Sequence, residues 1–202
     1  MLIRPAVAGD RDALYDICLR TGDAGADATA LYRDRELIGS IWAGPYLALE
    51  PDLSFVAVGE DGVTGYVLGA ADTAAFEAAC EQRWWPDLRK RWPEPPAADT
   101  TSADGRLIER IHHPPATPAS LLVEFPAHLH INLLPSGQGR GAGGRLVETL
   151  FAALRARDVA GVHLGVGRRN ERAIGFYEHL GFRAIADVAD APDSLVMGMR
   201  VR

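Results

Sequence analysis

Apolar positions in the second half of the chain alternate between short continuous runs and longer stretches with helical spacing. The runs predict strands at 127–134, 162–166, 182–188 and 195–201, and the spaced stretches predict helices at 141–157 and 171–180. Strands that alternate with helices favour an α/β fold with a partly parallel central sheet flanked by helices.

The first half carries shorter elements. They are predicted as a strand at 2–5, helices at 10–19 and 31–41, a hairpin of 55–58 and 64–68 around an Asp-Gly turn, and a helix at 73–91. Residues 93–118 are rich in proline and poor in apolar side chains, which predicts an exposed loop. Residues 73–120 therefore look like an inserted helix and loop within a single domain of 1–202.

Composition narrows the class of protein. The 202 residues are 48% hydrophobic and 24% charged, as in ordinary globular proteins, and the net charge of −6 argues against a nucleic-acid partner. The sequence shows neither a membrane-span pattern nor a signal-peptide pattern, so we expect a cytoplasmic protein. Cys18 and Cys80 lie in helical patterns without metal-ligand spacing, which predicts buried free thiols and no metal site.

The most informative segment is 138–143, Gln-Gly-Arg-Gly-Ala-Gly. It follows the apolar run at 130–134 and precedes the helical pattern at 146–151, so it reads as a strand, a glycine-rich turn and a helix. Glycine lets the backbone approach a ligand closely, and a helix N-terminus favours an anion. The segment therefore predicts a site for a phosphate-bearing ligand.

Three kinds of phosphate site compete for this turn. A P-loop needs Lys-Ser/Thr after its last glycine, and that pair is missing here. Gly139, Gly141 and Gly144 do match a dinucleotide fingerprint, but the next strand ends near Arg168 and Arg169 instead of an acidic residue, which leaves only an NADP-type reading open. The third reading begins at Gln138.

The segment 138–143 resembles the pyrophosphate signature Arg/Gln-x-x-Gly-x-Gly/Ala of the GNAT superfamily of N-acetyltransferases. The preceding Leu-Leu-Pro at 133–135 is similar to the end of that family's acyl-CoA strand, and 169–182 is similar to its Asn-containing turn and Ala-x-x-Phe-Tyr-x-x-x-Gly-Phe helix. The opening Ile-Arg-Pro-Ala at 3–6 also resembles the family. The resemblance implies a GNAT-type mixed sheet with an atypical helix and Pro-rich insertion before the acyl-CoA strand.

The resemblance implies that acetyl-CoA is the acetyl donor. Backbone N–H groups of the turn would hold its pyrophosphate, Gln138 would support the turn, and Leu133 N–H would stabilise charge on the acyl oxygen. The implied donor-binding residues are Leu133, Leu134, Gln138, Gly139, Arg140, Gly141, Ala142, Gly143, Gly144, Asn170, Phe176 and Tyr177. Asn170 also suits a helix N-cap, and both roles are compatible.

Catalytic roles follow from the same resemblance. Tyr177 would protonate the departing CoA thiolate, although it would also fit as a core aromatic residue. His128 and His130 share one strand face and are candidates for the general base, against a plain structural role in the sheet. Glu124 and Asp72 are alternatives, and a water relay would need no single base.

Residues 76–92 further resemble the acetyltransferase-like C-terminal domain of O-GlcNAcases and its bacterial relatives. The tryptophans of this stretch, which are Trp84, Trp85 and Trp92, are expected to pack in the core and to form part of the rim of the acceptor pocket. The expected activity is transfer of an acetyl group to a primary amine of a small molecule or protein by direct attack, in a monomer or homodimer that binds neither nucleic acid nor membrane. The alternative is an acetyl-CoA-binding pseudo-acetyltransferase that recruits or senses.

Overall fold

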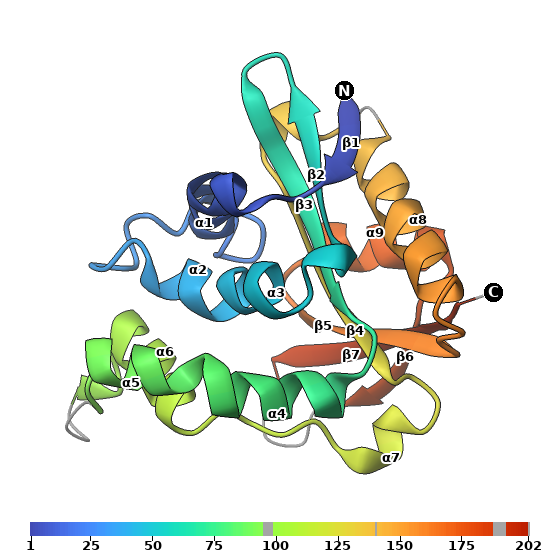
Figure 1. Cartoon of the computed structure of the whole chain (residues 1–202). Coiled ribbons are helices and arrows are strands. Elements are labelled where there is room, and N and C mark those ends of the chain that lie inside the picture. The colour runs from blue at the N-terminus through green and yellow to red at the C-terminus, as the bar shows by residue number, and fades with distance from the viewer. Residues whose placement is uncertain (95–98, 140, 188–192, 202) are drawn as a thin grey trace.

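The computed structural model describes residues 1–94, 99–139, 141–187 and 193–201 (Figure 1). One sheet of seven strands runs through these residues in the order β1-β2-β3-β4-β5-β7-β6. The strands are β1 (Leu2–Pro5), β2 (Ser54–Gly59), β3 (Gly62–Ala70), β4 (Ala127–Leu133), β5 (Gly161–Gly167), β6 (Arg183–Asp187) and β7 (Ser194–Arg200). The pair β4 and β5 is parallel, and the other neighbouring pairs are antiparallel. The predicted mixed, partly parallel sheet is confirmed.

Helices cover both faces of this sheet. They are α1 (Arg11–Arg20), α2 (Leu37–Trp42), α3 (Gly44–Leu49), α4 (Thr73–Arg83), α5 (Trp85–Arg91), α6 (Ala103–His112), α7 (Ala119–Leu122), α8 (Ala142–Arg155) and α9 (Glu171–Leu180). In Figure 1, α1 to α3 lie on one side of the β2–β3 hairpin and α8 lies on the other. Alternate residues of the strands therefore enter two separate cores.

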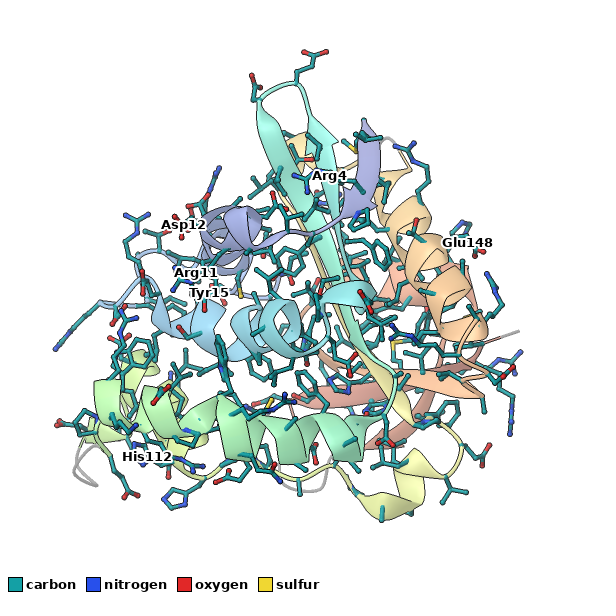
Figure 2. The ribbon with its side chains drawn as sticks, viewed as in Figure 1. Arg4, Arg11, Asp12, Tyr15, His112 and Glu148 are labelled. Carbon is teal, nitrogen blue, oxygen red and sulfur yellow. The ribbon has the colours of Figure 1, made fainter. Side chains whose placement is uncertain are left out.

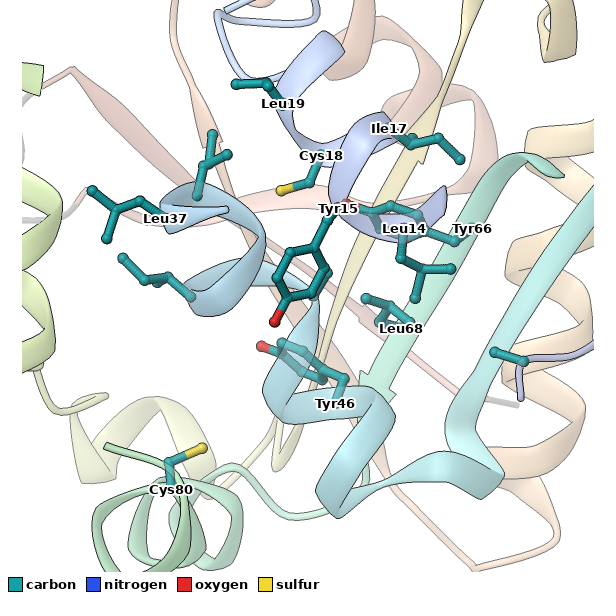
Figure 3. Close-up of a cluster of buried hydrophobic side chains, with 14 of the residues drawn as sticks. Leu14, Tyr15, Ile17, Cys18, Leu19, Leu37, Tyr46, Tyr66, Leu68 and Cys80 are labelled. Carbon is teal, nitrogen blue, oxygen red and sulfur yellow. The ribbon is translucent and has the colours of Figure 1, made fainter. Parts of the chain in front are cut away.

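The first core lies between β3 and helices α1 to α6, and Figure 3 shows part of it. Tyr66 and Leu68 of β3 are fully buried there beside Leu14 and Cys18 of α1. Their neighbour Val67 points the other way, into the second core with Leu150 of α8. This alternation fixes the register of the hairpin, because a slip of one residue would exchange the two faces.

The entry into α1 is fixed by a charged pair. Arg4 of β1, labelled in Figure 2, donates two hydrogen bonds of 2.7 and 2.8 Å to the Asp10 carboxylate, which also accepts the Val7 N–H at 2.8 Å. These bonds lower the pKa of Asp10. On the next turn, the Arg11 guanidinium lies 4.1 Å from the centre of the Tyr15 ring. Strand β1 and helix α1 are thereby held together.

Both cysteines are free and buried, as the sequence predicted. Figure 3 shows Cys18 on α1 and Cys80 on α4 well apart in the same core. Burial raises the pKa of each thiol to about 12. Both groups therefore stay protonated at neutral pH and are poor nucleophiles.

The predicted helix at 31–41 is wrong in its first half. Helix α2 begins at Leu37, and the preceding residues form turns. The Asp34 carboxylate accepts the Glu36 N–H at 2.9 Å, a local side-chain bond that competes with helix formation. The predicted helix at 73–91 is in fact two helices that break at Trp84, because Pro86 stands in the first turn of α5, where proline starts a helix but does not continue one.

The largest correction concerns 93–118, which the composition predicted as an exposed loop. Residues 103–112 form helix α6, whose N-cap Ser102 accepts the Gly105 N–H at 2.9 Å. Its Ile111 is completely buried in the first core, with Leu107 and Ile108 packed beside it. The signal was present as three apolar residues at helical spacing, but the surrounding prolines and polar residues concealed it.

Replacement of Ile111 by alanine should show that α6 is structural. We expect the free energy of unfolding to fall by about 2–4 kcal/mol, because the change leaves a cavity in a packed core. Urea unfolding measures this, with Val123→Ala as the control, since Val123 is 81% exposed and should change stability little. Equal stability of the two variants would restore the loop interpretation.

Candidate acyl-transfer site

The site is organised by a separation between β4 and β5. In the described residues these parallel strands pair only at Ala127 with Val162 and at His128 with His163. Beyond these positions β4 continues to Leu133 beside β3, while β5 continues beside β7. The two strands diverge, which leaves a gap in the middle of the sheet.

Backbone groups of β4 face this gap. The Leu134 N–H donates to the Thr64 oxygen across the β3 side at 2.9 Å. Hydrogen-bonding direction alternates along a strand, so Leu133 and Ile131 direct their backbone groups to the opposite side, toward β5. The Leu133 oxygen accepts the Gln138 side-chain amide at 2.7 Å. The Leu133 N–H is left facing the gap, where a ligand could accept it.

The glycine turn closes one end of the gap. Gly139 and Gly141 have φ angles of 75° and 72°, which residues with a Cβ rarely adopt, and Gly141 is the N-cap of α8. Ala142, Gly143 and Gly144 follow as the first turn of α8, whose N–H groups have no partners within the helix. A Cβ at Gly143 would lie only 3.0 Å from the Phe176 ring. Arg140, also predicted to bind the donor, lies outside the described residues.

A cavity of about 2110 Å³ runs from this turn to the region between α2, α4 and α6. Its lining includes most of the predicted donor-binding residues, which are Leu133, Gln138, Gly139, Gly141, Ala142, Gly143, Gly144, Asn170, Phe176 and Tyr177. Leu134 does not line it and is buried in the first core instead. The structure thus gathers the predicted residues from three separate segments, with Leu134 as the exception.

Helix α9 brings three of these residues to the cavity. Asn170 is its N-cap, with its side-chain oxygen accepting the Ala173 N–H at 3.1 Å, so the predicted capping role is confirmed. Phe176 and Tyr177 lie side by side, with ring centroids 5.6 Å apart. Tyr177 is 7% exposed, and burial raises its pKa, so its hydroxyl keeps the proton. Among the described residues no hydrogen-bond partner holds that hydroxyl.

His128 sits in a chain of hydrogen bonds at the other end of the gap. The Thr73 hydroxyl donates to the Pro126 oxygen at 2.7 Å, so its own oxygen must accept from His128 Nδ1, also at 2.7 Å. His128 Nε2 then accepts from the Tyr46 hydroxyl at 2.7 Å. Burial lowers the pKa of His128, which favours the neutral ring with its proton on Nδ1 and with Nε2 accepting from Tyr46. Both nitrogens are engaged, so His128 can take a proton only through Tyr46.

His130 lines the cavity between two aromatic rings. Trp42 and Tyr46 each lie 5.3 Å from it, measured between ring centroids. Burial, with Arg110 and His163 nearby, lowers the pKa of His130 to about 4. The ring is therefore neutral at pH 7 and can accept a hydrogen bond, but it is a weak base.

The alternative bases are less well placed. The Asp72 carboxylate caps α4 by accepting the Ala75 N–H at 3.0 Å and does not line the cavity. Glu124 does line it, but it is exposed and pairs with Arg200 at 2.7 Å. The tryptophan prediction holds in part, since Trp85 and Trp92 are buried in the first core and Trp85 also lines the cavity.

Sequence reasoning missed much of the cavity lining, including four large side chains around its acceptor end. They are Trp42, Tyr46, Glu77 and Arg110, which come from α2, α3, α4 and α6. None belongs to a recognisable motif, and only the packing of these helices brings them together.

The segment between α1 and α2 bridges the two sides of the gap. Its Thr21 hydroxyl oxygen accepts the Asn132 amide of β4 at 2.6 Å. On the other side, Asp23 pairs with Arg169 at 3.4 Å, and a Cβ on Gly25 would lie 3.5 Å from the Asn170 side chain. The segment therefore spans from β4 to the start of α9 over the cavity.

The mixed sheet and the glycine turn after β4 are the features that the resemblance to N-acetyltransferases implied. The chain belongs to the acetyltransferase (GNAT) family, whose model matches residues 9–182. It is accordingly an acyltransferase, and acetyl transfer is the general reaction of the family.

Known proteins agree with this assignment. The chain shares 40% sequence identity with SsHAT, whose crystal structure matches it with a TM-score of 0.90. The match covers 100% of this chain and 98% of SsHAT. The ribosomal-protein-alanine N-acetyltransferase of Brucella melitensis is 18% identical with a TM-score of 0.56 over 99% of both chains, a likeness in fold alone. A mycothiol acetyltransferase of Beutenbergia cavernae is 46% identical over 52 residues, which span 26% of this chain and 18% of that protein.

Within the described residues, no helix has the length and apolar content needed to cross a membrane. The narrower resemblance to the O-GlcNAcase C-terminal domain stays a prediction.

Proposed function

We propose that the chain binds acetyl-CoA in the gap between β4 and β5 and transfers its acetyl group to a primary amine by direct attack. The observation that carries this proposal is the divergence of β4 and β5, which directs the Leu133 N–H away from β3 at a cavity that the glycine turn and Tyr177 also line. The turn supplies N–H groups and a helix N-terminus for the pyrophosphate. The pantetheine arm would follow β4, with Asn170 and Phe176 beside it.

The chemistry follows from these positions. The amine nitrogen forms a bond to the acyl carbon, and the carbon–sulfur bond breaks. Charge on the acyl oxygen is stabilised by the Leu133 N–H, and the departing thiolate takes a proton from the Tyr177 hydroxyl. The amine passes its proton to water or to His130, the neutral ring in this part of the cavity. Cys18 and Cys80 are buried and protonated, so neither thiol is suited to carry the acetyl group as a covalent intermediate. The amine therefore attacks acetyl-CoA directly.

The test is release of free CoA thiol from acetyl-CoA across a panel of primary amines, with binding of acetyl-CoA measured separately by calorimetry. Turnover with an amine that gives a stable N-acetyl product supports the proposal. Tight acetyl-CoA binding with no turnover on any amine would favour the pseudo-acetyltransferase.

If His130 receives the proton, kcat should depend on its low pKa. His130 is neutral above about pH 4, so we expect kcat to persist at pH 6 and to fall as the pH drops through about 4. Burial contributes most to this value, followed by the charges of Arg110 and His163, and the rings of His128 and Tyr46 also contact His130. His130→Gln should lose this acid limb, while its binding of acetyl-CoA at each pH stays as in the wild type. An acid limb that persists in His130→Gln would assign the proton to another group.

A further inference from the structure

Arg110 of α6 places a guanidinium in the cavity near His130. It lines the cavity, is half-buried, and lies with its guanidinium carbon 4.5 Å from the centre of the Trp42 ring. Trp42 in turn contacts His130. Withdrawal from water lowers the pKa of Arg110.

No carboxylate of the described residues lies within 4.0 Å of the Arg110 guanidinium. Arg110 also donates no side-chain hydrogen bond to any described residue. Glu77 is the acidic residue whose charge acts on the pKa of Arg110. Its carboxylate accepts hydrogen bonds from the Thr117 hydroxyl at 2.6 Å and from the Thr117 N–H at 3.1 Å. By contrast, Arg169 at the other end of the cavity is paired with Asp23. A half-buried cation without an ionic partner is costly, and a ligand anion would relieve that cost.

We infer that Arg110 and Trp42 form an anion subsite of the acceptor pocket, so that the preferred acceptor is a primary amine that also carries a carboxylate. This inference rests on the proposed amine acetyltransferase function. A guanidinium can bind a carboxylate through two parallel hydrogen bonds, and the Trp42 face holds it in place. The subsite lies on the acceptor side, away from the glycine turn.

The position of the subsite also limits the length of the acceptor. The amine must reach the acyl carbon beside Leu133, whereas Arg110 lies near His130. Three residues of β4 separate these points, roughly 10 Å at the rise of a strand. The carboxylate should therefore lie several bonds from the amine, as in an ω-amino acid rather than an α-amino acid.

The experiment compares ω-amino acids of four to eight carbons with their ω-amino carboxamides, which have the same shape without the charge. With the wild type, we expect kcat/KM for the carboxylate to exceed that for the carboxamide by at least about tenfold at the best length. Arg110→Gln should bring this ratio near one, and the ratio is the readout because Arg110 also lowers the pKa of His130. Arg110→Lys, which keeps the charge but not the planar fork, should retain part of the preference.

Arg106→Gln is the matched control. Arg106 lies one turn earlier on α6 and also lines the cavity, but it is exposed and its guanidinium donates to the Thr101 oxygen. This variant should keep the full preference for the carboxylate. A wild-type ratio near one at every length would overturn the inference, and so would an equal loss on both acceptor series in Arg110→Gln. If Arg110→Gln does not fold, the wild type and Arg110→Lys carry the same comparison.

A binding measurement separates this inference from the proposed function. Calorimetric titration of the CoA-bound protein with hexanoate and hexanamide requires no turnover. Hexanoate binding that Arg110→Gln abolishes would support the subsite even if no amine were acetylated. Equal binding of hexanoate and hexanamide would overturn it.

Discussion

Tyr177→Phe should lower kcat by roughly 10²–10⁴-fold and leave acetyl-CoA affinity almost unchanged. The substitution removes only the hydroxyl, and no described residue depends on that hydroxyl for a hydrogen bond. The ring contacts to Phe176 and Phe182 should persist. The centroid of each of these rings lies 5.6 Å from the centroid of the Tyr177 ring. The loss would therefore fall on the chemical step, as measured by thiol release at saturating acetyl-CoA.

The raised pKa of Tyr177 is compatible with this role. Burial destabilises any anion in the same surroundings, including the departing thiolate, just as it raises the pKa of the Cys18 and Cys80 thiols. Burial thus shifts the pKa of the acid and that of the leaving group in the same direction, so the raised pKa of Tyr177 does not by itself oppose proton transfer to the thiolate.

Tyr66→Phe is the control for this change. Tyr66 is fully buried on β3 and does not line the cavity, so removal of its hydroxyl should leave kcat within about threefold of the wild type. Full turnover in Tyr177→Phe would return Tyr177 to the core-aromatic role. An equal loss in both variants would indicate a general effect of the core on activity.

The two ends of the cavity differ in how far the sequence could predict them. The donor end depends on local signals, since a glycine turn at 138–143 and a helix at 171–180 are each predicted from contiguous residues. Even there, the side chain of Leu134 lies in the first core and not in the cavity that Leu133 lines, because a one-residue step along a strand reverses the direction of the side chain.

The acceptor end depends on long-range packing. Tyr46 meets His128 across 82 positions of sequence, and Arg110 meets Trp42 across the fold. Helix α6 was predicted as a loop, so Arg110 could not be placed in any site. Local patterns cannot show which helix faces pack against each other, and the acceptor end is formed by such contacts between distant helices.

Gly144→Asp should weaken acetyl-CoA binding by about 100-fold without loss of stability. Gly144 is the third residue of α8, and a Cβ there would have no atom within 4 Å, so the side chain fits without strain. A carboxylate about 5 Å from a phosphate charge costs about 3 kcal/mol at an effective dielectric constant near 20, which corresponds to roughly 100-fold in Kd. Aspartate in the first turn of a helix is favourable to the helix itself, so the protein should stay folded.

Gly144→Ala isolates the effect of the charge. Alanine adds the same Cβ and favours the helix by about 0.5–1 kcal/mol, so its Kd for acetyl-CoA should stay within about threefold of the wild type. Gly141 is a poorer site for this test, because its φ of 72° would add strain to any substitution. Calorimetric Kd values for the two Gly144 variants, with their melting temperatures, decide the matter. Unchanged affinity in a folded Gly144→Asp would mean that the pyrophosphate lies elsewhere, and the glycine turn would then serve only as the entry to α8.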